Sequence, residues 1–515
     1  MENILLPCRK IAIFKSDEFM QVKTQQDEFQ SYLKDASNIV GGYAEKVFIP
    51  ENEKEIAEIL AEANAKKIPV TISGARTGTV GGAIPFGGYV ISMEKLNQVK
   101  EINKKDCFAV VQGGTILKDF QRLVESENLF YPPDPTEWSC QIGGNIATNA
   151  SGARSFKYGA TRRYVRALKV ILPNGETLSL KRGKIFSEKG YIELQTDQGS
   201  IIRAKLPTYR QPNVRKNTTG YFSGDKVDAV DIFIGSEGTL GVIVEAELEL
   251  LPKPEAFFSG IVFFKDERDL LDFVFEAREL SFRSRAERNQ NEIDATLLEY
   301  FDSQSLKFIS QKFPETPQTV SSAIFFEQET TQDNEDLLLE KWNALLEKHN
   351  ASLEISWFTT NEQDREKMRQ FRHALPVAVN ERIARYNQRK VGTDMAVPDE
   401  NFLSFLRFYK IKLEESGIDY VIFGHIGDSH LHANLLPKNE EEAVKSRHLY
   451  GRFIAQAIML GGTISAEHGI GKHKRKYLYV QFGERYLNEM VAMKKAFDPH
   501  GILGQGNLFD AKFLN

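Results

Sequence analysis

Apolar and polar residues alternate along residues 421–436, and the middle of this stretch is the turn-forming run Gly427-Asp428-Ser429. The alternation predicts two short strands joined by a tight turn. Because side chains alternate between the two faces of a strand, His425 near the end of the first strand and His432 on the second become cross-strand neighbours in this arrangement. Asn434 then lies beside them on the same face.

Two imidazoles placed in this way suit a divalent metal that accepts nitrogen ligands. The alternative is a pair of buried histidines whose nitrogens bond to the backbone. A second cluster weakens this alternative, because Glu467 and His468 add a carboxylate and another imidazole. All nine histidines lie between His349 and His500, so chemistry that needs an imidazole belongs to the last third of the chain.

The pattern of apolar positions divides the chain into four parts. Residues 1–45 are polar and predict a helical extension. Residues 46–255 combine strands, a helix and glycine-rich loops. In residues 256–460 apolar strands alternate with helices, which predicts a ferredoxin-like α/β plait with its helices on one face. Residues 461–515 contain Glu467-His468 and a turn-rich tail that we expect to return to the first domain, in an α+β protein overall.

Three stretches of small residues lie within the second part: residues 73–82, 131–154 and 235–243, here named cradles 1, 2 and 3. Small residues let the backbone approach a ligand, and successive N–H groups can bind an anion. Cradle 2 has too little side-chain bulk to build a core of its own, which favours a large, flat cofactor over an Ω-like surface loop. Neither a Walker loop nor a Rossmann fingerprint is present.

Composition narrows the class of protein. At 515 residues the chain is too long for one core, so two or three domains are expected. The net charge of −5 argues against nucleic-acid binding. The three cysteines are too far apart for a disulfide framework, a zinc site or an iron–sulfur cluster, which indicates a reducing compartment. No apolar run reaches membrane-spanning length and no secretion signal is evident, so we expect a cytoplasmic protein, with peripheral contact at the inner membrane left open.

In combination the motifs resemble the FAD-linked oxidase and dehydrogenase family of the vanillyl-alcohol-oxidase type, with PCMH-type FAD binding. Within it they are similar to the D-2-hydroxyacid dehydrogenases, such as D-lactate dehydrogenase, the glycolate oxidase flavin subunit and D-2-hydroxyglutarate dehydrogenase. The resemblance runs from about Lys46 to the end. The motifs that carry it are Pro133-Asp134-Pro135, Gly143-Gly144-Asn145, Ser151-Gly152, Gly235 to Gly241, His425 to His432, Glu467 to Gly471 and Asp498-Pro499.

The resemblance implies a two-part FAD-binding domain, a cap that covers the isoalloxazine, and a tail that returns to the FAD domain. It implies that a D-2-hydroxyacid loses its hydroxyl proton to a histidine and its C2 hydride to flavin N5. The implied metal ligands, for zinc or manganese, are His425, His432 and Glu467. The implied catalytic and substrate-binding residues are His468 as the base, Arg372 for the substrate carboxylate, and Asn434. The implied cofactor-binding residues are Gly74, Arg76, Thr77, Gly78, Pro133, Asp134, Gly143, Gly144, Thr148, Ser151, Gly152, Glu237, Gly238, Ile243 and Asn507.

Two positions depart from the family pattern. Arg76 stands in cradle 1 where relatives commonly carry glycine, and it either contacts the pyrophosphate or crowds it. His430 stands where relatives often carry asparagine; it alternates to the opposite strand face, so we expect a structural role. The expected FAD domain contains no histidine, which excludes a covalent histidyl–flavin bond there and predicts non-covalent FAD.

The expected partners are a small 2-hydroxyacid and an electron acceptor, for which a quinone, an electron-transfer flavoprotein and a cytochrome are all open. A homodimer is compatible with the sequence, although no motif supports one. Three alternatives compete with the dehydrogenase. They are a non-catalytic or electron-transfer flavoprotein subunit of a glycolate-oxidase-like complex, an enzyme like alkyl-dihydroxyacetone-phosphate synthase, and a metal-binding structural protein.

Overall fold

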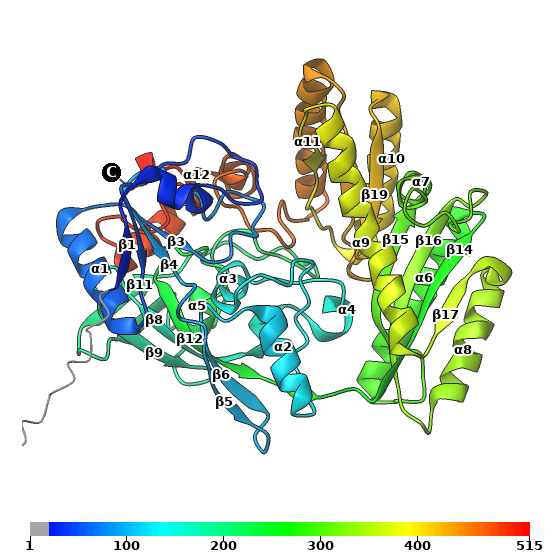
Figure 1. Cartoon of the computed structure of the whole chain (residues 1–515), viewed down its shortest axis with the longest axis horizontal. Helices are drawn as coiled ribbons and strands as arrows, with labels where there is room; N and C mark the ends of the chain where they lie inside the picture. The colour runs from blue at the N-terminus through cyan, green and yellow to red at the C-terminus, as the bar shows by residue number, and fades with distance from the viewer. Residues whose placement is uncertain (1–19, 515) are drawn as a thin grey trace, which may run out of the picture.

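The computed structural model describes residues 20–514 and consists of two bodies side by side (Figure 1). The first body, on the left, contains residues 20–255 and the C-terminal segment, so the blue and red ends of the chain meet in it. The second body, on the right, contains residues 256–460. Among residues 20–514, no helix combines the length and the apolar composition that a membrane span requires.

The first body contains two larger sheets, with strand orders β1-β2-β4-β3 and β5-β6-β12-β8-β9. The strands are β1 (Gln21–Lys23), β2 (Lys46–Ile49), β3 (Val70–Ser73), β4 (Tyr89–Ser92), β5 (Val99–Asn103), β6 (Phe108–Gln112), β7 (Leu129–Phe130), β8 (Val165–Ile171), β9 (Thr177–Lys181), β10 (Tyr191–Gln195), β11 (Ile201–Lys205), β12 (Val242–Glu249) and β13 (Leu251–Pro252). The helices are η1 (Gln26–Leu33), α1 (Glu53–Lys66), α2 (Leu117–Ser126), α3 (Ile142–Thr148), α4 (Ser155–Tyr158), η2 (Thr161–Tyr164), α5 (Ala229–Phe233), α12 (Arg475–Phe497) and η6 (Ala511–Phe513).

Helix α1 shows how local sequence sets these elements. Asn52 caps its first turn by accepting a hydrogen bond from the Glu55 backbone N–H, and Lys67 ends it in the left-handed conformation. Its apolar stripe, which includes Ile56 and Leu60, packs on the β1-β2-β4-β3 sheet.

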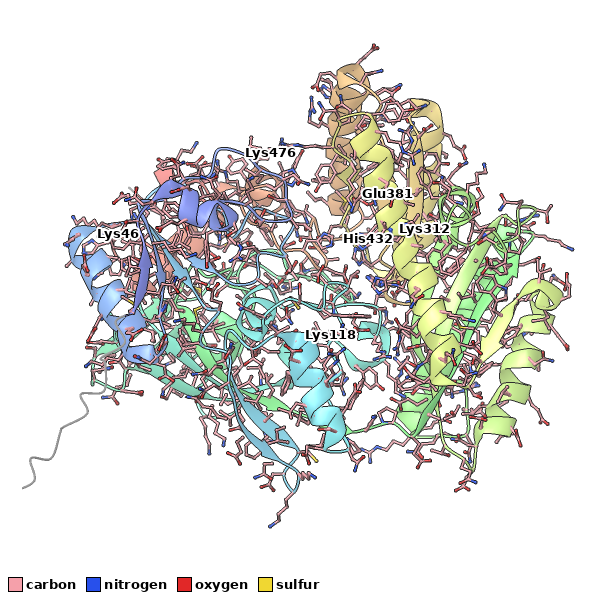
Figure 2. The ribbon with its side chains drawn as sticks, viewed as in Figure 1. Lys46, Lys118, Lys312, Glu381, His432 and Lys476 are labelled. Carbon is pink, nitrogen blue, oxygen red and sulfur yellow. The ribbon has the colours of Figure 1, made fainter. Side chains whose placement is uncertain are left out.

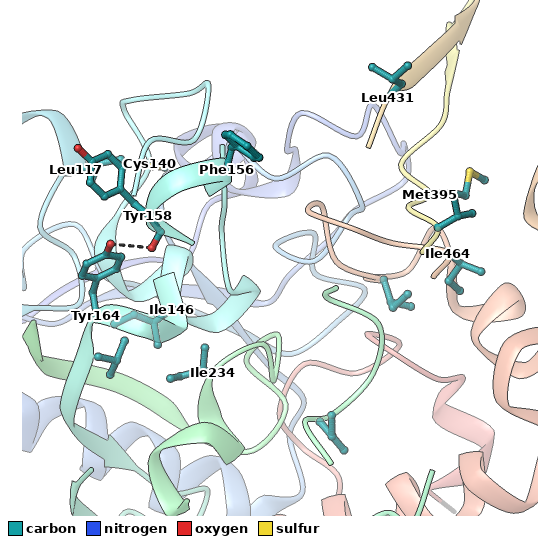
Figure 3. Close-up of a cluster of buried hydrophobic side chains, with 14 of the residues drawn as sticks. Leu117, Cys140, Ile146, Phe156, Tyr158, Tyr164, Ile234, Met395, Leu431 and Ile464 are labelled. Atoms are coloured by element: carbon teal, nitrogen blue, oxygen red, sulfur yellow. Dashed lines mark hydrogen bonds between the residues drawn. The ribbon is translucent and has the colours of Figure 1, made fainter. Parts of the chain in front are cut away.

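In the neighbouring core, Figure 3 shows Tyr164, whose hydroxyl donates a 2.8 Å hydrogen bond to the Tyr158 carbonyl.

The helical extension expected for residues 1–45 is only partly present. Residues 1–19 lie outside the described residues. From residue 20 to 45, the one helical element is the 3-10 helix η1, and β1 pairs antiparallel with β2, so that Val22 lies opposite Phe48. Three residues are too few for an alternating pattern to be visible, which is why the strand was not predicted.

The second body is built on one seven-stranded antiparallel sheet with the order β17-β14-β16-β15-β19-β20-β18. Its strands are β14 (Ala256–Phe264), β15 (Ala295–Asp302), β16 (Ser322–Thr330), β17 (Trp357–Thr359), β18 (Val391–Gly392), β19 (Tyr420–Gly424) and β20 (His432–Leu435). Its helices are α6 (Glu267–Glu287), α7 (Ser303–Ile309), α8 (Glu335–Lys348), η3 (Leu353–Ile355), α9 (Glu362–Arg385), η4 (Asp399–Asn401), α10 (Phe402–Ser416), η5 (Ile426–Asp428) and α11 (Glu440–Met459).

The mixed helix-and-sheet architecture was predicted correctly, but the expectation that the cap helices cover one face was wrong. Phe263 on β14 packs with Phe371 of α9 and the residues of α7. The next residue, Phe264, points to the other face and packs with Phe273 of α6. Since neighbouring strand residues point to opposite faces, helices cover both sides of this sheet. The consecutive apolar residues of β14 are typical of a strand buried on both faces.

The C-terminal tail returns to the first body, as predicted. The Val70 backbone N–H donates a 2.8 Å hydrogen bond to the Ile502 carbonyl, and the Gly504 N–H donates a 3.0 Å hydrogen bond to the Val70 carbonyl. The tail thereby extends the sheet of β3 at its free edge.

Candidate active site between the two bodies

The predicted histidine hairpin is present. Strands β19 and β20 pair antiparallel, with Phe423 opposite His432. Between them lie the 3-10 turn η5 and Ser429, whose φ of 53° is in the left-handed region. His425 directly precedes this turn, and its ring centroid lies 5.7 Å from that of His432. The hairpin therefore makes the two imidazoles neighbours.

The carboxylate of Glu467 reaches both rings from a distant part of the sequence. Its Oε1 lies 3.1 Å from His425 Nε2, and its Oε2 lies 3.5 Å from His432 Nε2. Each ring directs Nδ1 elsewhere, His432 to the Thr393 carbonyl at 2.9 Å and His425 to Glu299 at 2.5 Å. With Nδ1 engaged in this way, Nε2 is the nitrogen that each ring can offer to a metal. This donor set fits a divalent metal such as zinc or manganese. Figure 2 shows His432 on the side of the second body that faces the first.

Glu299 is a buried carboxylate that the sequence-based prediction did not include. It lies on β15, is 1% exposed, and its Oε2 accepts a 2.7 Å hydrogen bond from Nε of Arg372 on α9. Burial opposes its ionisation, but Arg372 and His425 together lower the pKa of Glu299 to about 2. One ionised carboxylate thus orients both a candidate metal ligand and the candidate substrate-binding arginine. The signal in the sequence was a single acidic residue within the apolar run of residues 297–301.

Asn434 follows His432 by two residues on β20, so its side chain lies on the same face of the strand. It is 5% exposed and faces Gly392 of β18. A Cβ atom at Gly392 would lie 2.5 Å from Asn434 Oδ1, so the glycine makes room for this amide. Asn434 therefore borders the imidazole cluster, whereas Arg372 is linked to it through Glu299.

Asp394 organises the loop that contains Glu467 and His468, and it too was missed. Its carboxylate accepts hydrogen bonds from the backbone N–H groups of Glu467 and His468, both at 3.1 Å. Ser465 Oγ and Lys474 Nζ donate to it at 2.8 and 2.5 Å. The loop is thus held at four points by one buried anion.

The ring of His468 stacks on that of His432, with centroids 5.4 Å apart and planes 9° from parallel. Its Nδ1 lies 3.5 Å from Asp394 Oδ2. Desolvation lowers the pKa of His468, Asp394 opposes this shift, and Lys474 adds to it. The imidazole is therefore neutral at pH 7, while 38% of the side chain stays exposed. A neutral, accessible imidazole of this kind can accept a proton.

The first body also reaches Glu467. Nζ of the buried Lys216 lies 2.6 Å from Glu467 Oε1, and Ser151 Oγ of cradle 2 donates to the same oxygen at 3.0 Å. Burial would raise the pKa of Glu467, but His425 and Lys216 hold it well below its usual range. Lys216 was not predicted, because nothing in its local sequence marks a buried lysine. These contacts join the cradles to the metal-ligand candidates.

His430 does not point away from the cluster as expected. It is fully buried, and its ring centroid lies 4.6 Å from that of His432. The alternation argument failed because β20 begins only at His432. Before it, η5 and the left-handed Ser429 interrupt the strand geometry.

Cradle 1 curves around Gly78, where an added Cβ would meet nothing within 4 Å. Arg76 turns away from this open side. Its Nη1 donates to Ser73 Oγ and the Gly74 carbonyl, both at 3.1 Å, and its guanidinium lies 4.6 Å from the centre of the Tyr32 ring. From the sequence we expected Arg76 either to contact the pyrophosphate or to crowd it. These contacts support neither expectation. Thr77, beside it, is half-buried.

Cradle 2 packs closely on itself and on the backbone of Gly113. The Gly143 N–H donates a 2.7 Å hydrogen bond to the Gly113 carbonyl, and Gly152 packs against Asp134. Asp134 Oδ1 accepts a 3.1 Å hydrogen bond from the Trp138 indole. The remaining predicted residues of this cradle lie along its rim: the Pro133 carbonyl accepts from Gln121 at 3.0 Å, and Thr148 Oγ1 donates to the Gly144 carbonyl at 2.9 Å.

Cradle 3 connects the other two. The N–H of Glu237 donates to the Ala147 carbonyl of cradle 2 at 2.8 Å. Asn507 Nδ2 donates to the carbonyls of Gly82 and Glu237, at 3.0 and 3.1 Å, and so links cradles 1 and 3. Gly238 has a φ of 69°, which favours glycine.

The Glu237 carboxylate turns toward the segment that follows Glu467 and His468. It accepts the N–H groups of Ile470 and Gly471 at 2.7 and 2.6 Å, and burial raises the pKa of Glu237 to about 7. Ile243 is 7% exposed, and its carbonyl lies where a Cβ on Gly113 would clash. Hydrogen bonds from Glu237 and Asn507 thus connect the three cradles into one surface.

This surface fits FAD. A Cβ at Gly144 would meet open space, as at Gly78. Within cradle 2, Gln141 Oε1 and Asn145 Nδ2 are buried and have no hydrogen-bond partner among the described residues. Buried polar atoms without partners require a ligand or water, and a polar, flat cofactor supplies hydrogen-bonding groups. A cavity of about 390 Å³, lined by Ser151, Lys216 and Arg162 among others, adds a positively charged wall beside this surface.

Replacing Gly152 with alanine should weaken cofactor binding, because the new Cβ would lie 1.7 Å from the Asp134 carbonyl oxygen. We expect the overpacking to destabilise the folded protein by about 1–3 kcal/mol. We also expect a lower ratio of flavin to protein absorbance in the purified variant. Gly451→Ala is the control, since that glycine of α11 has open space around it. Equal flavin content in the two variants would contradict the tight closure of cradle 2.

Residues 44–181 match a family described as FAD binding domain, and residues 274–508 match one described as FAD linked oxidases, C-terminal domain. Curated relatives match over nearly the whole chain. Glycolate oxidase subunit GlcD of Bacillus subtilis (strain 168) is 30% identical, over 93% of this chain and 92% of the relative. D-lactate dehydrogenase of Anaerostipes hadrus is 29% identical, over 93% and 92%. D-2-hydroxyglutarate dehydrogenase of Stutzerimonas stutzeri (strain A1501) is 28% identical, over 95% and 96%.

Solved structures share the fold at lower identity. Alkyldihydroxyacetonephosphate synthase superposes with a TM-score of 0.66 at 16% identity, covering 96% of this chain and 83% of the other. p-Cresol methylhydroxylase superposes with a TM-score of 0.66 at 15% identity, covering 95% and 94%. With its connected glycine cradles, its antiparallel cap and these relatives, the chain belongs to the FAD-linked oxidase family.

Proposed function

We propose that this protein oxidises a D-2-hydroxyacid of the D-lactate type to the corresponding 2-oxoacid, with non-covalent FAD and a divalent metal, zinc or manganese. The observation that carries the proposal is the convergence of His425, His432 and Glu467 beside the stacked ring of His468. When bound, the flavin accepts a hydride and the metal polarises the substrate hydroxyl. The relatives named as D-lactate and D-2-hydroxyglutarate dehydrogenases support this class of substrate.

The chain's own residues supply binding and proton transfer. Nε of Arg372 is occupied by Glu299, and its two terminal nitrogens make no hydrogen bond to another described residue. A guanidinium anchored on one side in this way can bind a substrate carboxylate with the other. The amide of Asn434 can hydrogen-bond the same substrate from β20. His468 takes the hydroxyl proton, and Asp394 keeps that imidazole oriented and stabilises it once it is charged.

The fifteen cofactor-binding residues named from the sequence are part of this proposal, but two of them have a different role from the one expected. Glu237 and Asn507 bond to the protein itself and act by joining the cradles. Electrons then leave the flavin for a quinone, an electron-transfer flavoprotein or a cytochrome. The rates at which these three acceptors reoxidise the reduced flavin would show which of them the protein uses. We further propose that the protein is cytoplasmic.

The test is anaerobic flavin reduction against a panel of D- and L-2-hydroxyacids that includes lactate and 2-hydroxyglutarate. We expect D-acids to bleach the visible flavin absorbance and L-acids to leave it unchanged, and we expect the fastest acid to define the substrate. A preparation that contains flavin but is bleached by no acid, with zinc or manganese added, would favour an electron-transfer subunit and refute the dehydrogenase. Release of all flavin on acid precipitation would support non-covalent binding.

A further inference from the structure

His430 is the one imidazole of the hairpin to which the proposed function gives no role. It is 0% exposed, and its ring centroid lies 5.6 Å from that of His425 and 4.6 Å from that of His432. One ligand atom from each of these three rings and one Glu467 oxygen all lie within 4.8 Å of one another. Four donor atoms, rather than three, therefore surround the same point.

Neither ring nitrogen of His430 has a hydrogen-bond partner among the described residues. The nearest acid is Asp394, whose Oδ1 lies 3.4 Å from Nε2 without the alignment of a hydrogen bond. Leaving buried polar atoms unpaired is unfavourable, so such atoms in native structures usually meet an ion or a water. The unpaired ring is aimed into a cluster of metal-ligating groups.

The backbone holds His430 in this inward orientation. Its N–H donates a 3.2 Å hydrogen bond to the His425 carbonyl, closing the turn of η5. On its other side it forms an isolated antiparallel bridge with Ala396. An imidazole fixed in this way by the backbone is positioned to offer a ring nitrogen to the cluster.

We propose that His430 is a fourth protein ligand of the metal, so that the site presents three imidazoles and one carboxylate. The inference rests on the metal site of the proposed function and extends it in one respect, the selection of the metal. Imidazole nitrogens suit zinc, whereas manganese prefers oxygen ligands. Four protein donors would also match the number of ligands that zinc commonly takes. The protein should therefore retain zinc strongly and bind manganese weakly.

The test uses the full-length, flavin-loaded protein, freed of metal with a chelator and titrated separately with zinc and with manganese against a chromophoric chelator. Wild type is compared with His430→Asn and His430→Gln, which keep a polar side chain but remove the imidazole. Loss of an outer-shell partner alone costs about 10–100-fold in metal affinity, so loss of a ligand should weaken zinc binding at least that much. Manganese affinity should change little. His448→Asn is the control, because His448 is exposed on α11.

A second measurement uses wild type alone and does not depend on whether the variants fold. The protein is loaded with cobalt(II), and the exchangeable, paramagnetically shifted imidazole N–H proton signals are counted by NMR. Three such signals support the proposal; two overturn it. Unchanged zinc affinity in both His430 variants would also overturn it, while the dehydrogenase assignment stands. If wild type binds no metal, the metal site of the proposed function fails together with this inference.

Discussion

Replacing Glu299 with glutamine should weaken binding of the proposed metal and leave FAD binding intact. In the native arrangement, the carboxylate accepts hydrogen bonds from Nδ1 of His425 and Nε of Arg372. A glutamine has one oxygen, which can serve only one of these donors, and its NH₂ group must then face the other. Facing His425, the amide would reverse the tautomer, so that Nε2 carries the hydrogen and loses its lone pair. Metal affinity should fall by about 10–100-fold or more.

The same substitution leaves the positive charge of Arg372 without its buried partner. Breaking a buried ion pair destabilises proteins by about 3–5 kcal/mol, so a general loss of stability must be separated from a specific loss of metal. Glu327→Gln is the matched control. Glu327 lies on the neighbouring strand β16, is fully buried, and pairs with Arg154 and Arg369.

Both glutamine variants should unfold at lower temperature, and only Glu299→Gln should lose metal, measured by elemental analysis of the purified protein. Glu299→Asp, which restores the charge, should recover metal in part. If Glu327→Gln loses as much metal as Glu299→Gln, then Glu299 acts through stability alone and is no positioning residue for the site.

Replacing His468 with alanine should slow flavin reduction by a D-2-hydroxyacid about 10²–10⁴-fold, the usual contribution of a general base. The effect should fall on the limiting reduction rate at saturating substrate, because Arg372 and Asn434 remain to bind the acid. Stopped-flow measurement of the flavin absorbance under anaerobic conditions separates that rate from the apparent dissociation constant.

His473→Ala is the control, since it removes an exposed imidazole from the same segment. Exogenous imidazole should restore part of the rate in His468→Ala, because the cavity left by the ring is accessible to solvent. A reduction rate in His468→Ala equal to that of the control would assign the proton transfer to another group.

Local patterns predicted the features that depend on neighbours in sequence. The histidine hairpin follows from apolar alternation around one turn, and the cradles follow from runs of glycine and other small residues. The residues that sequence reasoning missed have partners far along the chain. Glu299 meets His425 across 126 positions, and Lys216 meets Glu467 across 251. No local pattern distinguishes these buried charges from exposed ones, because their burial and their partners depend on which distant segments become neighbours in the fold.

The errors also have physical causes. Two-residue alternation placed His430 on the wrong face, because the rule applies only where the strand is continuous. The helices of the second body appeared to cover one face, because a strand apolar at every position does not reveal how its two sides are covered. β1 was missed because a three-residue edge strand is stabilised by its partner β2 rather than by its own pattern.

The tail that bonds to Val70 has a consequence for how the protein is made. Residues 502–507 close the edge of β3 and, through Asn507, hold cradles 1 and 3 together. During translation these residues leave the ribosome more than four hundred positions after the strand they complete. The cofactor-binding surface of the first body therefore stays incomplete until the entire second body has been synthesised. The contacts that complete the FAD-binding surface can therefore form only at the end of synthesis.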